Sequence, residues 1–190
     1  MLDQLLQYDT ELFLFLNNLG SSKWDQLWLI ITNKLTFIPL YAILLFLIYR
    51  HLGWKALLLL VFVIAGMITF TDQVTNLFKD GFQRARPCRA SDIEEMVRFV
   101  APRCGKYGFF SGHSSNSMAA AVFAGLLLRP YYRNLIFILL FWSAVVAYSR
   151  IYVGVHYPFD VFMGGLFGFF LAFLLLRVFN RISFFRVLKP

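Results

Sequence analysis

Three short clusters of polar residues carry side chains that could bind and transfer a phosphoryl group. They are Lys79-x6-Arg86-Pro87, Ser111-Gly112-His113 and Ser149-Arg150-x5-His156-x3-Asp160. Each cluster stands at an end of an apolar segment, so all three reach one membrane face if those segments cross the bilayer. Arginine suits a phosphate because its planar guanidinium donates two parallel hydrogen bonds. We therefore expect Lys79, Arg86 and Arg150 to converge on one small anion.

The second cluster provides the beginning of a helix, which is itself favourable for anions. Ser111 and Gly112 immediately precede an apolar run. Their backbone N–H groups and the serine hydroxyl would therefore lie at the positive end of a helix dipole. Gly112 also lets the backbone approach a ligand closely. We expect Ser111 and Gly112 to bind phosphate oxygens together with the three cations.

The third cluster combines a histidine with a carboxylate. His156 precedes Pro158, which favours the first turn of a helix, and Asp160 then lies in that turn. The carboxylate can accept the Nδ1–H of the imidazole, fix its tautomer and leave Nε2 free for attack. His113 is a second titratable group, suited to protonating a leaving alkoxide. The expected catalytic residues are therefore His156, His113 and Asp160.

The segments that must position these clusters are long and apolar. Hydrophobic residues make up 59% of the chain and the mean hydropathy is +0.67, which excludes an ordinary soluble domain. Apolar runs near the roughly 20 residues that cross a bilayer occupy 27–49, 54–78, 114–129, 134–149 and 158–180. We predict an all-α integral membrane protein with about five transmembrane helices, and six spans are the alternative.

The N-terminal segment predicts a different kind of helix. Apolar side chains recur there at helical spacing, at Leu2, Leu5, Leu6, Leu12, Phe13, Leu16 and Leu19. Polar residues such as Asp9 and Asn17 stand between them, and this pattern indicates an amphipathic helix in the membrane interface. No repeat or linker divides the chain. We therefore expect one membrane-embedded domain over 1–190, with 1–22 as the interfacial helix.

Basic residues in the connections indicate the orientation. They follow the first, third and fifth spans, as Arg50, His51 and Lys55, then Arg129 and Arg133, then Arg181, Arg186 and Lys189. With five spans these groups share one side, which the positive-inside rule makes cytoplasmic. The loop 79–113, which carries the first two clusters, would then be extracytoplasmic. The net charge of +8 thus reflects topology and an anion site, and we expect no nucleic-acid partner.

Several other polar residues receive ordinary structural roles. Lys34 and Pro39 interrupt the first span, and Lys34 could extend toward the interface if it lies near an end. Arg84 and Arg89 flank Arg86 outside the pattern, so we assign them to solvent or lipid headgroups. His51 has no polar cluster around it and is assigned a structural role.

The polar residues that directly follow His113, and the two cysteines, also lie outside the three clusters or their expected chemistry. Ser114, Ser115 and Asn116 are assigned to helix initiation and packing. Cys88 and Cys104 could form a disulfide if their loop faces an oxidising compartment, or they could remain free thiols. Both possibilities stay open at the level of sequence.

In their order and spacing, the three clusters resemble the motifs of the type-2 phosphatidic acid phosphatase superfamily. That superfamily includes membrane lipid phosphatases, undecaprenyl-diphosphate phosphatases, bacterial acid phosphatases and vanadium haloperoxidases. The resemblance implies that His156 is the nucleophile and forms a phosphohistidine, that Asp160 orients it, and that His113 is the general acid. It also implies that no divalent metal or other cofactor is needed. The residues expected to bind the phosphate are Lys79, Arg86, Ser111, Gly112 and Arg150.

The chain departs from the superfamily pattern at one position. The second motif usually opens with proline, where this chain has Phe110. Proline supplies no chemical group to the reaction, so we expect a local change in the loop rather than lost activity.

The resulting hypothesis is a membrane enzyme that hydrolyses a phosphomonoester or diphosphate of a lipid. Polyprenyl diphosphate and a glycerophospholipid phosphate, such as phosphatidylglycerol phosphate or phosphatidic acid, rank first, and a lipid A phosphate also fits. The resemblance favours a bacterial inner membrane, with the site on the extracytoplasmic face and membrane lipids as partners. A catalytically dead lipid transporter or phosphate-binding membrane protein is the main alternative. A vanadium haloperoxidase is less favoured because those relatives are soluble and larger. The sequence does not indicate the oligomeric state.

Overall fold

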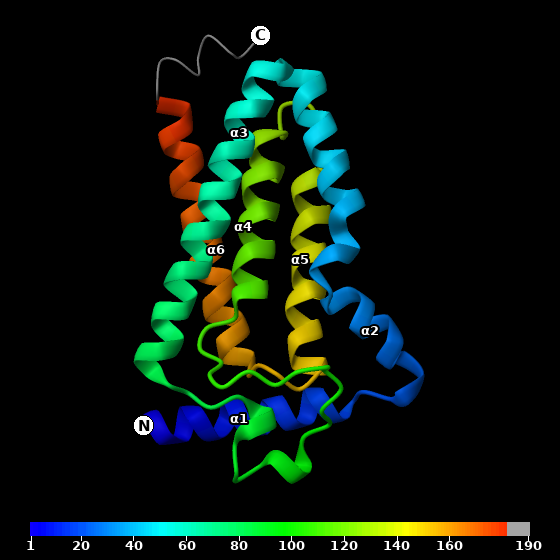
Figure 1. Ribbon diagram of the computed structural model, residues 1–190, viewed down its shortest axis with the longest axis vertical. Coiled ribbons are helices and arrows are strands. Elements are labelled where there is room, and N and C mark those ends of the chain that lie inside the picture. The colour runs from blue at the N-terminus through cyan, green and yellow to red at the C-terminus, as the bar shows by residue number, and fades with distance from the viewer. Residues whose placement is uncertain (182–190) are drawn as a thin grey trace.

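The computed structural model describes residues 1–181, and in that part the chain is helical with no strand (Figure 1). The α-helices are α1 (Leu2–Asn18), α2 (Asp25–Thr32), α3 (Ile38–Phe82), α4 (Gly112–Leu127), α5 (Leu135–Tyr152) and α6 (Pro158–Arg181). Four short 3-10 turns accompany them, at Ser22–Trp24, Lys34–Phe37, Pro87–Arg89 and Glu94–Met96. The predicted all-α class is confirmed. Arg186 and Lys189, which contributed to the predicted orientation, lie outside the described residues.

Helix α3 consists of two antiparallel arms. The chain reverses at Gly53, whose φ of 78° and ψ of 173° lie in a region that glycine adopts readily. The first arm rises beside α5, and the second returns along α4 and α6 (Figure 1). The predicted spans 27–49 and 54–78 thus meet in a tight turn, and the second arm continues to Phe82.

The predicted first span is wrong as a single helix. Helix α2 ends at Thr32. The backbone is extended at Asn33, whose side chain accepts a hydrogen bond from the Leu35 N–H (3.0 Å). Asparagine favours such a break because its side chain competes for backbone hydrogen bonds. Helix α3 then begins at Ile38, with Pro39 in its first turn, a position that proline tolerates.

Three segments are long and apolar enough to cross a membrane by length and composition: Lys34–Phe82, Leu135–Tyr152 and Pro158–Arg181. Helix α4 has 16 residues, and most of its side chains are buried among the other helices. The structure therefore supports an integral membrane protein, but it does not confirm a count of five or six spans. The number of crossings stays a prediction.

Helix α4 packs very closely against α6 because two glycines face the contact. A Cβ added to Gly164 would lie 2.4 Å from the Ser111 carbonyl oxygen, and one added to Gly168 would lie 2.2 Å from that of Ser115. Small residues four positions apart let two helix backbones approach in this way. The packing places the beginning of α4 beside the beginning of α6, where the second and third polar clusters stand.

This packing predicts different effects for two neighbouring glycines. Gly168→Ala should lower stability by about 1–3 kcal/mol, because the added methyl group meets backbone that cannot move aside. At Gly165 the nearest atom to an added Cβ is the Met118 methyl carbon at 3.8 Å, so Gly165→Ala is the matched control. Thermal unfolding of both variants in detergent checks the prediction. Equal melting temperatures for the two variants would contradict it.

Helix α1 lies across one end of the helix bundle (Figure 1). Asn17, fully buried, donates to the carbonyl groups of Arg98, Ile151 and Tyr152 and accepts from the Arg98 N–H, at 2.8–3.1 Å. These bonds attach α1 to the end of α5. On its other side the helix exposes an apolar stripe of Leu5, Tyr8, Leu12, Phe15 and Leu19. The structure thus has a helix where one was predicted, and its exposed stripe suits contact with lipid. Its place in the membrane interface stays a prediction.

Different connecting segments lie at the two ends of the helix bundle. The loop between α3 and α4 runs over 83–111, shorter than the predicted 79–113, and lies with α1 and the α5–α6 turn at one end (Figure 1). The Gly53 turn and the α4–α5 connection lie at the other end. There, His51 stacks on Tyr131 with 4.1 Å between ring centroids and shares a hydrogen bond with Tyr132 (3.0 Å). These contacts fit the structural role predicted for His51.

Candidate active site

His156 and Asp160 form a buried pair at the α5–α6 turn. The Nδ1 atom of His156 lies 3.3 Å from Oδ2 of Asp160, and this oxygen also accepts the Tyr157 N–H (3.2 Å). The exposed fractions of His156 and Asp160 are 2% and 0%. Asp160 lies in the first turn of α6, which begins at Pro158, as the spacing predicted. Because Nδ1 faces the carboxylate, Nε2 is the ring nitrogen left for attack.

Gly108, which belongs to none of the three polar clusters, closes over this pair. A Cβ on Gly108 would lie 2.9 Å from Oδ2 of Asp160 and 3.7 Å from Nδ1 of His156. The Gly108 N–H donates to the Arg84 carbonyl (2.9 Å), which fixes the approach of this loop. Only glycine leaves room for the carboxylate here, and no sequence signal beyond its residue type pointed to that contact.

The assignment of Arg84 to solvent or headgroups is wrong. Its guanidinium donates to Oδ1 of Asp160 (2.9 Å) and to Oδ2 of Asp9 (2.7 Å), and it lies 4.0 Å from the centroid of the Tyr157 ring. The reason is local geometry: Ala85 pairs with Tyr107 in an antiparallel bridge, so Arg84 and Arg86 leave this extended segment on the same side. Arg84 therefore reaches the buried His156–Asp160 pair from a position next to Arg86, the residue predicted to bind phosphate.

Asp9 connects helix α1 to the same network. Its Oδ1 atom accepts the Phe159 N–H (2.8 Å), at the beginning of α6, while Oδ2 accepts from Arg84. Burial raises the pKa of Asp9, and the hydrogen bond from Arg84 acts in the opposite direction. The sequence placed Asp9 only among the polar positions of an amphipathic helix, so its contact with the site is a finding of the tertiary structure.

The three predicted cations surround His156. Burial, followed by the charges of Arg86, Arg150 and Lys79, holds the pKa of His156 well below its ordinary value. The neutral form of the imidazole is therefore favoured at neutral pH. We call Lys79, Arg86 and Arg150 the phosphate cradle. Lys79 comes from the last turn of α3, Arg86 from the loop and Arg150 from the last turn of α5.

Contacts with protein hold the arginines of the cradle in place. The Nε of Arg86 donates to the Tyr107 carbonyl (2.9 Å), and a Cβ on Gly105 would lie 3.1 Å from the guanidinium. Arg150 donates to the hydroxyl of Thr32 on α2, while its buried Nε has no partner among residues 1–181. A bound phosphate would offer acceptor oxygens to these groups.

Ser111 has a more structural role than its motif predicts. Its N–H donates to the Asp160 carbonyl (2.9 Å), and its hydroxyl accepts from the Ser114 N–H (3.5 Å) as the cap of α4. The Ser111 N–H therefore already has an acceptor within the protein. Gly112 and His113 occupy the first two positions of α4, where backbone N–H groups have no acceptor within the helix. Phosphate binding by Gly112 and by the Ser111 hydroxyl stays a prediction.

Phe110, at the position of the expected proline, is buried in an aromatic cluster. Its ring centroid lies 5.2 Å from that of Phe78 on α3 and 5.2 Å from that of Phe167 on α6. Edge and offset contacts of this kind add to the stability that burial provides. The aromatic side chain thus holds the loop against two helices directly before the Ser111 motif.

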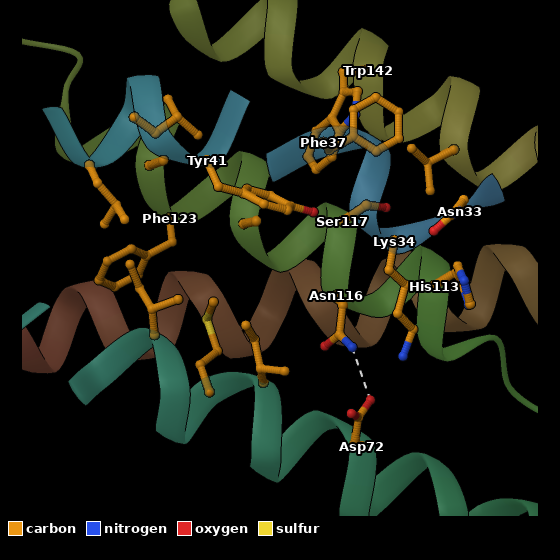
Figure 2. Close-up of a pocket in the computed structure, with 18 of the residues that line it drawn as sticks. Asn33, Lys34, Phe37, Tyr41, Asp72, His113, Asn116, Ser117, Phe123 and Trp142 are labelled. Atoms are coloured by element: carbon orange, nitrogen blue, oxygen red, sulfur yellow. Dashed lines mark hydrogen bonds between the residues drawn. The ribbon is translucent and has the colours of Figure 1, made fainter. Parts of the chain in front are cut away.

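His113 opens onto a cavity of about 300 Å³ between both arms of α3, α4 and α5. Lys34, Asp72, His113 and Asn116 gather at one end, whereas the rest is mainly apolar (Figure 2). Asn116 donates to Oδ1 of Asp72 (2.9 Å), so it does more than the packing predicted from sequence.

Among residues 1–181, no group of three or more His, Cys, Asp or Glu residues is placed to hold a metal ion.

The loop beside Arg86 is closed by a disulfide. Cys88 and Cys104 are bonded, with 6.2 Å between their Cα atoms, which decides between the two possibilities that the sequence left open. Arg89, which is exposed, donates to the Cys104 carbonyl (3.3 Å). The crosslink thus joins the segment that carries Arg86 to the segment that packs Gly105 on its guanidinium.

Loss of this disulfide should destabilise the protein. The bond closes a loop with a sequence separation of 16, and the chain-entropy model assigns about 3 kcal/mol to a loop of roughly that length. We expect Cys88→Ser, Cys104→Ser and the double variant to lower the melting temperature equally. Reducing agent should lower that of the wild type to the same value and leave the variants unchanged. A wild-type melting temperature insensitive to reduction would contradict the prediction.

Comparison with known proteins identifies the family. The model of the PAP2 superfamily matches residues 54–184. The lipid A 4'-phosphatase of Bacteroides thetaiotaomicron is 33% identical over 186 residues, covering 96% of this chain and 82% of that protein. The lipid A 4'-phosphatase of Porphyromonas gingivalis is 33% identical over 167 residues, covering 86% and 69%.

A solved structure shares the fold. The crystal structure of a transmembrane PAP2-type phosphatidylglycerolphosphate phosphatase from Bacillus subtilis superposes with a TM-score of 0.75. It is 19% identical in sequence, with 94% of this chain and 88% of that chain covered. At this identity the likeness concerns the arrangement of helices.

Proposed function

Because the chain belongs to the PAP2 superfamily and is a membrane lipid phosphatase, we propose that it works through a phosphohistidine formed on His156. The observation that carries this proposal is the setting of His156. Asp160 holds its Nδ1, and burial together with the cradle keeps its ring neutral. Nε2 is then a nucleophile next to the cations that would bind the phosphate. A phosphate-binding protein or transporter without catalysis would have no need of this arrangement.

The proposed reaction proceeds in two steps. Nε2 of His156 attacks phosphorus, the bond between phosphorus and the lipid oxygen breaks, and His113 gives its proton to that oxygen. His113 then takes a proton from water as the water oxygen attacks phosphorus, and cleavage of the N–P bond restores His156. The cradle stabilises the negative charge on the phosphoryl oxygens in both steps.

We propose a lipid A phosphate as the first substrate to consider. Two relatives that align with most of this chain are lipid A 4'-phosphatases, which moves this lipid ahead of the polyprenyl diphosphates and glycerophospholipid phosphates. The cavity beside His113 supports a lipid of this general kind, because a polar end next to the catalytic residues continues into apolar surface.

The proposed setting is a bacterial inner membrane, with the site on the extracytoplasmic face. Five crossings would comprise the two arms of α3 together with α4, α5 and α6, with α1 in the interface at the end that carries the site. Two observations support this setting. The apolar stripe of α1 is exposed at that end, and the Cys88–Cys104 disulfide suits an oxidising compartment.

A panel of four lipids tests the substrate. Phosphate release by the purified protein would be measured on lipid A, undecaprenyl diphosphate, phosphatidylglycerol phosphate and phosphatidic acid in mixed micelles. We expect the highest kcat/KM on lipid A. A higher value on another lipid would reject this substrate but keep the class of enzyme. Absence of release from all four, with liposome flux that survives replacement of His113 and His156, would favour the transporter.

A further inference from the structure

Asp72 is a carboxylate inside an apolar helix, on the side that faces the cavity. Ile64, Ile68 and Asp72 follow one another at intervals of four residues and all line the cavity. Lys79 lies seven residues further along the same face of α3, which corresponds to about 10 Å of helix rise. Asp72 therefore lies beyond the phosphate cradle, toward the middle of the bundle.

Asp72 makes few contacts with other polar groups: it accepts one hydrogen bond, from Asn116, and its charge attracts that of Lys79. Charged groups inside membrane helices are costly and commonly mark functional sites. Asp72 forms no ion pair with any residue in 1–181, and its hydrogen bond comes from Nδ2 of Asn116. The Oδ1 atom of Asn116 is buried and also lacks a partner among these residues. Since a carboxylate can accept about four hydrogen bonds, this pair retains acceptors that the protein does not satisfy.

Figure 2 shows where these acceptors lie. Asp72 and Asn116 project from α3 and α4 toward the same end of the cavity as His113, and Lys34 approaches from the opposite side. His113 and Asn116 are three residues apart on α4, so they share one face of that helix. A lipid whose phosphate lies between His113 and His156 would bring its headgroup to Asp72 and its chain to the apolar part.

We propose that Asp72 and Asn116 form a specificity subsite that accepts hydrogen bonds from hydroxyl or amide N–H groups beside the scissile phosphate. The chemistry of the pair defines the ligand, because an ionised carboxylate only accepts. A phosphorylated glycolipid presents such donors, whereas phosphatidic acid and polyprenyl phosphates present none next to the phosphate. This subsite rests on the proposed function, and it names which lipids the same catalytic site prefers.

Asp72→Asn tests the subsite with little change in shape. It removes the charge and replaces one acceptor by a donor. We expect kcat/KM on lipid A to fall about tenfold to a hundredfold, as for loss of a hydrogen bond to a charged group, while kcat/KM on phosphatidic acid changes less than about twofold. Gln73→Ala is the matched control, since Gln73 is exposed on α3 and does not line the cavity. It should leave both values unchanged.

A binding measurement separates failure of the subsite from failure of the proposed function. In a His156→Ala background, Asp72→Asn should weaken binding of lipid A by a similar factor and leave phosphatidic acid unaffected, without any turnover. An unchanged preference in both assays would overturn the subsite while the phosphatase remains. An equal loss on both lipids, or a lower melting temperature than that of Gln73→Ala, would assign Asp72 a structural role instead. A wild type that releases no phosphate from any lipid would reject the proposed function itself.

Discussion

Replacing His156 with asparagine should reduce phosphate release by at least about 10⁴-fold, because it removes the nitrogen proposed to bond phosphorus. Asparagine keeps a polar group that can face Asp160, so the buried carboxylate is not left alone. The measurement is single-turnover phosphate release from the preferred lipid. Rapid acid-free quenching should also reveal an alkali-stable, acid-labile phosphoprotein in the wild type.

The control for this prediction is the folded state of the variant. His156→Asn should unfold thermally within a few degrees of the wild type and bind the lipid phosphate with similar affinity. Replacement of His113 should lower turnover less, by about 10²–10⁴-fold, as expected for an acid–base group. Turnover by His156→Asn above about one per cent of wild type, without a phosphoprotein in either, would reject His156 as the nucleophile.

Arg84→Met should destabilise the protein by about 3–5 kcal/mol, because it leaves two buried carboxylates without their shared cation. The exposed fractions of the side chains are 18% for Arg84, 9% for Asp9 and 0% for Asp160, so water cannot replace the guanidinium. We also expect turnover to fall, since Asp160 would lose the partner that fixes it opposite His156. Thermal unfolding and phosphate release measure the two effects.

Arg89→Met is the matched control for Arg84. Arg89 is exposed, and its hydrogen bond goes to a backbone carbonyl, so its removal should change stability by less than about 0.5 kcal/mol. Asp9→Asn should lower the free energy of unfolding by less than Arg84→Met does. In a protein that already carries Asp9→Asn, Arg84→Met should destabilise the fold less than it does in the wild type. If Arg84→Met prevents expression, Arg84→Lys can be compared with Arg89→Met instead, because lysine keeps the charge but lacks the second nitrogen of the guanidinium that bridges Asp9 and Asp160. Equal stability of the Arg84 and Arg89 variants would show that the network contributes nothing.

Much of the catalytic set is visible in the sequence because it depends on local spacing. Asp160 follows His156 by four residues, and Pro158 between them starts a helix, so the pair forms wherever that turn forms. The helical class follows equally directly, since an apolar chain can satisfy its backbone in lipid only by regular hydrogen bonding. The order of the clusters along alternating segments also placed them at one end of the bundle.

Contacts between distant segments needed the tertiary structure. Arg84 and Asp9 stand 75 residues apart, and their ion pair exists because α1 crosses the end of the bundle beside the α3–α4 loop. No periodicity encodes that docking, which depends on buried groups such as Asn17 finding carbonyls of another helix. The disulfide likewise depended on the loop bringing two cysteines together.

The sequence alone predicts a phosphate site made by two histidines, an aspartate and three cations. The residues that surround this site cannot be predicted from the sequence. Arg84, Asp9, Gly108 and Asp72 reach the site only through packing, because close approach of helix backbones at Gly168 and breaks at Asn33 and Gly53 decide which faces meet. Local spacing determines which groups stand close in the chain, whereas the three-dimensional fit of the helices determines which other residues hold them in place.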